Sequence, residues 1–131
     1  MSSDATVVVV DDDLSVRRSL ARLLASAGYE VIVCSSAEEF LAMPSVPRPA
    51  CVMTDVRMPG MSGLDLLDVL RTRRPSLPII LFSGDADPGM SAHARAAGAV
   101  SFLMKPFASE DLLSALGEAL DRDRAELARK A

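Results

Sequence analysis

Acidic side chains and one lysine stand at the ends of separate apolar runs in this sequence. They are Asp11, Asp12, Asp13, Asp55 and Lys105. A buried strand that ends in adjacent carboxylates is costly unless a positive charge compensates them, because like charges repel and lose solvation. Carboxylate oxygens are ligands that hard divalent cations prefer. The residues therefore indicate a site that holds a cation rather than a solvated surface.

The elements that would position these residues alternate along the chain. Apolar runs of about five residues are followed by longer amphipathic stretches, which is typical of a parallel sheet with helices on both faces. The predicted strands are 6–10, 29–34, 50–54, 77–82 and 99–103. We therefore predict an α/β fold of the flavodoxin-like (βα)5 type, with a doubly wound five-stranded parallel sheet in the order 2-1-3-4-5.

This strand order brings the acids together. Ligands of open parallel sheets collect beyond the carboxyl ends of the strands, where the strand order reverses. Because the first and third strands are neighbours, Asp11, Asp12 and Asp55 are expected to converge, and Mg²⁺ (or Mn²⁺) suits such a site. A phosphoryl group beside the metal would need further positive charge and donors, which Lys105 and the Ser83 hydroxyl would supply. One acid would then be the acceptor.

Each of these residues also has a structural interpretation. The acids 11–13 could complement the dipole of a helix that starts there, and Asp13 is expected to begin that helix. Asp55 and Ser83 could be turn residues, and Lys105 could be a surface lysine at a strand end. If all these interpretations held, four unrelated residues would have to lie at one edge of the sheet by coincidence. We therefore favour a shared site.

Length and composition exclude several functions. A chain of 131 residues is expected to form one domain. No apolar run approaches the roughly 18 residues of a membrane span, and the start lacks a secretion signal, so we expect a cytoplasmic protein without membrane contact. A net charge of -4 argues against direct nucleic-acid binding by this segment. Cys34 and Cys51 lack zinc-site spacing and are predicted to be buried free thiols.

In their order and spacing, the motifs resemble the receiver domain of bacterial two-component response regulators. The matching segments are 9–13, 54–63, 82–84 and 105–107, and segments 55–59 and 98–102 are similar to the FixJ-like subfamily. The resemblance runs from Thr6 to about Leu120. It implies a receiver domain at 1–120, followed at 121–131 by a charged helical extension or linker stub.

The resemblance implies a metal-dependent phosphorylation site. Asp55 would be the phosphoacceptor, Asp12 a direct Mg²⁺ ligand and Asp11 a second acidic contact. The backbone carbonyl of Arg57 would complete the protein ligands. Arg57 and Asp85 flank the pocket, so a salt bridge between them could gate water attack on the acyl phosphate.

The resemblance also implies a switch. Ser83 would move to a phosphoryl oxygen, Lys105 would pair with the same group, and Phe102 would swing inward on activation. The peptide bond before Pro106 would be cis, which would aim Lys105 into the site. The fourth helix, fifth strand and fifth helix would form a bistable surface for homodimerisation.

The implied function is regulatory: a phosphoryl group passes from a sensor histidine kinase to the chain, which catalyses only its own phosphorylation and dephosphorylation. Two outputs stay open, the N-terminal part of a transcriptional regulator and a freestanding regulator. A phosphatase of the haloacid dehalogenase type is less favoured, because Arg57 stands where that family needs a second acid. A flavin carrier is disfavoured because aspartates 11–13 would repel the flavin phosphate.

Overall fold

Five parallel strands form one sheet in the order β2-β1-β3-β4-β5, as predicted. The structure is a computed structural model that describes residues 5–85 and 89–130. The strands are β1 (Thr6–Val10), β2 (Glu30–Cys34), β3 (Ala50–Asp55), β4 (Ile79–Ser83) and β5 (Ser101–Met104). The helices are α1 (Leu14–Ser26), α2 (Ala37–Leu41), α3 (Gly63–Arg73), α4 (Met90–Ala96) and α5 (Ser109–Lys130).

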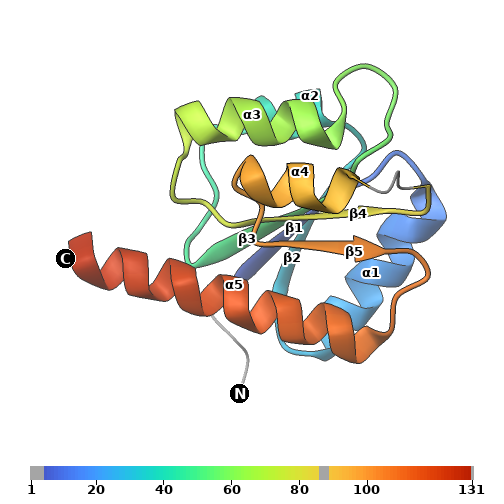
Figure 1. The fold of residues 1–131 in the computed structure, drawn as a ribbon. Helices are drawn as coiled ribbons and strands as arrows, with labels where there is room; N and C mark the ends of the chain where they lie inside the picture. Colours follow the sequence, from blue (N-terminus) through green and yellow to red (C-terminus); the bar gives the residue numbers. More distant parts are fainter. Residues whose placement is uncertain (1–4, 86–88, 131) are drawn as a thin grey trace.

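The sheet separates two apolar cores. Helices α2, α3 and α4 cover one face, and α1 and α5 cover the other (Figure 1). Alternate residues of β1 feed the two sides: Val8 and Val10 pack with the first group, and Val7 and Val9 with the second. Burial on both faces explains why the strands are continuous apolar runs rather than alternating ones.

Strands β4 and β5 begin two residues later than predicted. Pro78, which precedes β4, has no N–H to donate to a neighbouring strand. Before β5, the N–H of Ala99 donates to the carbonyl of Ala94 at 3.0 Å. This bond closes the end of α4 around Gly98, whose φ of 110° favours glycine. Strand β5 therefore begins only after this turn.

Both cysteines are buried free thiols, as predicted. Burial raises the pKa of the Cys34 thiol to about 11, so this thiol stays protonated at neutral pH. Within the described ranges, no helix has the length and apolar character that a membrane span requires.

Helix α5 continues unbroken to Lys130, and part of its charged second half packs against the sheet. Asp123 is 0% exposed and forms an ion pair with Arg48. Its Oδ2 also accepts hydrogen bonds from the Arg48 Nε at 3.1 Å and the Ala50 N–H at 2.8 Å. Asp123 follows Leu120 by three positions and therefore lies on the buried face of the helix. The boundary at residue 120 stays a prediction, but Asp123 belongs to the packed structure.

We predict that Asp123→Ala lowers the free energy of unfolding by about 3 kcal/mol, because it leaves the Arg48 charge and the Ala50 N–H without their acceptor. Urea unfolding followed by circular dichroism measures the change. Asp121→Ala is the matched control: Asp121 lies on the same helix with its side chain 80% exposed, and its removal should cost less than about 0.5 kcal/mol. Equal midpoints for the two variants would contradict the prediction.

Candidate functional site

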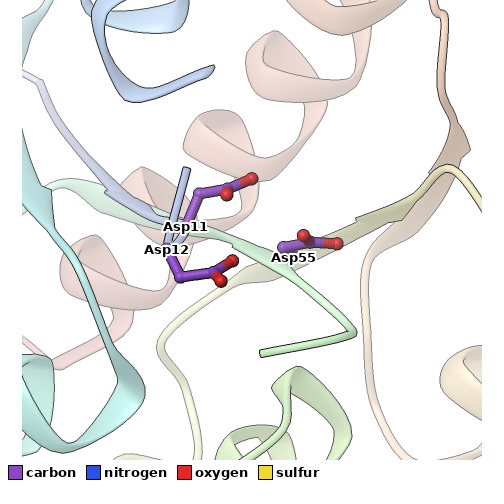
Figure 2. A group of neighbouring side chains, drawn as sticks. All are labelled: Asp11, Asp12 and Asp55. Atoms are coloured by element: carbon purple, nitrogen blue, oxygen red, sulfur yellow. The ribbon is translucent and has the colours of Figure 1, made fainter. Parts of the chain in front are cut away.

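Three carboxylates converge at the carboxyl edge of the sheet. Asp11 follows β1, and Asp55 ends the neighbouring strand β3, with Val10 paired to Thr54. One oxygen each from Asp11, Asp12 and Asp55 lie within 4.8 Å of one another. Figure 2 shows these side chains, hereafter the carboxylate cluster, together at this edge. The structure thus brings together the three acids that the sequence analysis placed at one site.

Asp13 has a different role in the same loop. Its side chain caps α1 by accepting hydrogen bonds from the N–H groups of Ser15 at 2.8 Å and Val16 at 3.4 Å. The hydrogen bonds from Ser15 lower the pKa of Asp13 below its usual value. The prediction that Asp13 begins the helix is therefore correct.

Lys105 provides a positive charge at the carboxylate cluster. Its Nζ lies 3.3 Å from Asp11 Oδ2 and 3.6 Å from Asp55 Oδ2. It also lies 4.9 Å from the centre of the Phe82 ring. Asp11 is 0% and Asp55 9% exposed, whereas Asp12 is exposed. Burial raises the pKa of Asp55, Lys105 opposes that shift, and the charge of Asp11 adds to it.

Ser83 lies on β4, the neighbour of β3, and Phe102 lies on β5, the next strand beyond β4. Ser83 is buried at the end of β4, and its hydroxyl accepts a hydrogen bond from the Asp85 N–H at 3.1 Å. Phe102 is buried in β5 and belongs to the core beneath α3 and α4. The Lys105-Pro106 bond is cis, as the resemblance implied.

Arg57 and Asp85 contact each other in the loops that follow β3 and β4. The Arg57 Nε lies 3.4 Å from Asp85 Oδ2 and donates a hydrogen bond to the Asp85 carbonyl at 3.2 Å. Their side chains are 54% and 84% exposed. An exposed pair of this kind contributes at most about 1 kcal/mol, so thermal motion can open it.

The sequence analysis missed two side chains that hold the loops of the site. Arg17 donates from its NH1 to the carbonyl of Asp11 at 2.7 Å. Glu38 of α2 accepts from the Met61 N–H at 3.1 Å, in the loop after Asp55. The position of Arg17, four residues after the helix cap, was a signal that it could reach back over the first turn. Glu38 carried no such signal, because α2 and this loop meet only in the folded chain.

The donor set of the carboxylate cluster fits a hard divalent cation. All its donors are carboxylate oxygens, and the exposed Asp12 leaves room for water ligands. Mg²⁺ takes oxygen ligands in octahedral geometry and usually keeps several waters, so one or two carboxylates suffice. The role of the Arg57 backbone carbonyl as a further ligand stays a prediction.

Comparison with known proteins gives the family. The family model described as response regulator receiver domain matches residues 7–117. Nodulation protein W of Bradyrhizobium diazoefficiens is 46% identical over 123 residues, which are 94% of this chain and 54% of that protein. Transcriptional regulatory protein FixJ of Rhizobium meliloti is 41% identical over 117 residues, or 89% and 57% of the two chains.

Solved structures agree. The crystal structure of FixJ-N superimposes with a TM-score of 0.83 at 40% identity, covering 91% of this chain and 95% of that one. The structure of response regulator StyR superimposes with a TM-score of 0.88 at 40% identity, covering 98% of this chain and 65% of that one. The chain therefore belongs to the response regulator receiver domain family. It is a receiver domain of the FixJ-like type, and it spans little more than half the length of curated relatives such as nodulation protein W.

The raised pKa of Asp55 makes a prediction for the metal-free protein. A carboxyl whose pKa is higher in the folded state contributes stability below its ordinary pKa, and this contribution is lost as the pH rises through the raised value. In EDTA at about pH 7.5, Asp55→Asn removes the ionised carboxylate and should therefore raise the melting temperature by about 3 °C. This gain should vanish at about pH 4.

Differential scanning calorimetry measures this shift. Asp68→Asn, an exposed carboxyl on α3, is the control and should change little at either pH. A destabilised Asp55→Asn protein in EDTA at neutral pH would contradict the electrostatic account of the site.

Proposed function

We propose that this receiver domain accepts a phosphoryl group on Asp55 from a sensor histidine kinase, with Mg²⁺ (or Mn²⁺) bound beside it. The convergence of Asp11, Asp12 and Asp55 next to Lys105 carries the proposal. Asp12 would bind the ion directly, with Asp11 as a second acidic contact and the Arg57 carbonyl as a further ligand. The chain is regulatory, and the only reactions that it catalyses are its own phosphorylation and dephosphorylation.

The reaction is an in-line displacement at phosphorus. An Asp55 carboxylate oxygen forms the new O–P bond while the N–P bond of the phosphohistidine breaks. The electron pair of that bond stays on the imidazole nitrogen, which regains a proton from solvent. Lys105 turns from the carboxylates to the transferred phosphoryl oxygens. When bound, the cation reduces the repulsion between the attacking carboxylate and the phosphoryl group.

The added dianion would then act on the switch residues. Ser83 can exchange its contact with the Asp85 N–H for a phosphoryl oxygen, to which its hydroxyl donates. Phe102 is already buried in this structure, which is the inward position that the resemblance implies for the activated protein. Gly89 is the N-cap residue of α4 and has no side chain to cap it, so the first turn of this helix is held weakly. We infer a phosphorylation-dependent shift of α4, β5 and α5 that permits homodimerisation.

The whole protein is proposed to be a transcriptional regulator in the cytoplasm, with this chain as its N-terminal receiver part. Two similar proteins, transcriptional regulatory proteins FixJ and TdiR, support this by their names, and the chain covers only 62% and 55% of their lengths. A freestanding regulator is the alternative. Direct contact with nucleic acid is not proposed for this segment, whose net charge is -4.

We predict that Asp55→Asn abolishes labelling by acetyl phosphate and Mg²⁺, because the amide is too weak a nucleophile to displace at phosphorus. Intact-protein mass spectrometry should show one added phosphoryl group on the native chain and on Asp68→Asn, and none on Asp55→Asn. EDTA should prevent labelling of the native chain and of Asp68→Asn. Undiminished labelling of Asp55→Asn would refute the assignment of the acceptor.

The contact between Arg57 and Asp85 is proposed to slow water attack on the acyl phosphate. Asp85→Ala removes the carboxylate but keeps the carbonyl that accepts from Arg57, so it should speed dephosphorylation by about twofold. Arg57→Met removes both contacts while keeping the backbone carbonyl, and it should speed dephosphorylation by about fivefold. Loss of the label after removal of acetyl phosphate gives the rates. Unchanged rates in both variants would show that no such gate exists.

A further inference from the structure

Arg17 of α1 reaches back to the loop that carries the acidic metal ligands. Its NH1 donates to the backbone carbonyl of Asp11 at 2.7 Å, and the side chain is partly buried. A hydrogen bond from a charged donor is stronger than a neutral one. Hydrogen bonds from Ser35 and, more weakly, the charge of Arg17 lower the pKa of Glu39 on α2. The positive charge of the guanidinium thus also acts on the Glu39 carboxylate.

The carbonyl that Arg17 binds belongs to the peptide unit between Asp11 and Asp12. This unit is planar, so a bond to its oxygen restricts the direction in which the chain enters Asp12. Asp11 is held independently: its N–H donates to the Cys34 carbonyl at 3.1 Å, and its Oδ1 accepts from the Asp13 N–H at 2.8 Å. Asp12, by contrast, is exposed. Of the two acids, Asp12 therefore has more conformational freedom, and the hydrogen bond from Arg17 restrains the backbone that leads into it.

We propose that Arg17 is a positioning residue for the divalent cation. By holding the peptide between the two acids, it presets the Asp12 carboxylate beside Asp11 and Asp55 before the cation arrives. Preorganised ligands bind more tightly because less conformational freedom is lost on binding. The inference rests on the proposed function, since it assumes that the carboxylate cluster binds Mg²⁺ or Mn²⁺.

Electrostatics alone predicts the opposite effect of removing this side chain. A guanidinium near the site repels a divalent cation, so the loss of its charge should tighten cation binding. Loss of the hydrogen bond to the Asp11 carbonyl should weaken it. The sign of the change therefore separates positioning from a simple charge effect.

The test compares Arg17→Met, Arg17→Lys and Arg18→Met. Arg17→Met keeps an apolar stem without a donor, Arg17→Lys keeps the charge and a donor, and Arg18→Met removes a neighbouring exposed arginine of the same helix. Electron paramagnetic resonance of free Mn²⁺ gives the dissociation constant without any phosphodonor. Arg17→Met should bind Mn²⁺ about fivefold more weakly than the native chain, and Arg17→Lys within about twofold of it. Arg18→Met should bind equally or slightly more tightly.

Labelling by acetyl phosphate provides a second readout. In Arg17→Met, the Mg²⁺ concentration for half-maximal rate should rise about fivefold, while the rate at saturating Mg²⁺ stays within about twofold. Melting in EDTA establishes that each variant is folded. If Arg17→Met does not fold, Arg17→Gln replaces it, because the glutamine side chain is too short to reach the Asp11 carbonyl.

The outcomes are distinguishable. Weaker cation binding by Arg17→Met, with binding by Arg18→Met unaffected, supports the inference. Equal or tighter binding by Arg17→Met overturns it, as does an equal loss in Arg18→Met. If the native chain itself neither binds Mn²⁺ nor accepts label, the proposed function fails instead.

Discussion

Repulsion among the carboxylates of Asp11, Asp12 and Asp55 is the constraint on which the site depends. One oxygen from each lies within 4.8 Å of the others, and Lys105 supplies a single compensating charge within 3.6 Å of two of them. Three carboxylates and one lysine leave an excess of negative charge. Burial raises the pKa of Asp55, Lys105 opposes that shift, and the charge of Asp11 adds to it. In the proposed function, a divalent cation would relieve the excess of negative charge, and the transferred phosphoryl group would then meet the charges of both the cation and Lys105.

The sheet maintains this unfavourable arrangement. Strands β1 and β3 are hydrogen-bonded in register and buried on both faces, so the acids at their ends cannot move apart without disrupting two cores. The free energy of burying the apolar strands offsets the cost of the adjacent charges. Packing thus stabilises a site that electrostatics alone would open, as is common where function demands locally unfavourable interactions.

The sequence analysis predicted the elements whose signals are local. The apolar run 6–10 and the cap Asp13 predicted β1 and α1, and the position of Asp55 after an apolar run placed it at the end of β3. Strand ends near Pro78 and Gly98 were misplaced, because the turn at the end of α4 and the missing N–H decide where pairing starts.

Contacts between distant segments could not be predicted from the sequence. Asp123 lies in a segment rich in charge, where solvent exposure is the ordinary expectation, yet it is buried against Arg48 from a loop 75 positions earlier. Glu38 likewise has the composition of a solvated helix face, and only the fold shows that it reaches the Met61 N–H. Both contacts depend on distances that a single sequence does not contain.

Anomalous diffraction from crystals grown with Mn²⁺ tests the central claim most directly. The account predicts one strong peak at the carboxyl edge of the sheet, about 2.1 Å from oxygens of Asp12 and Asp55 and close to Asp11. Crystals at saturating Mn²⁺ with no peak at that edge, or with the ion bound only elsewhere, would contradict it.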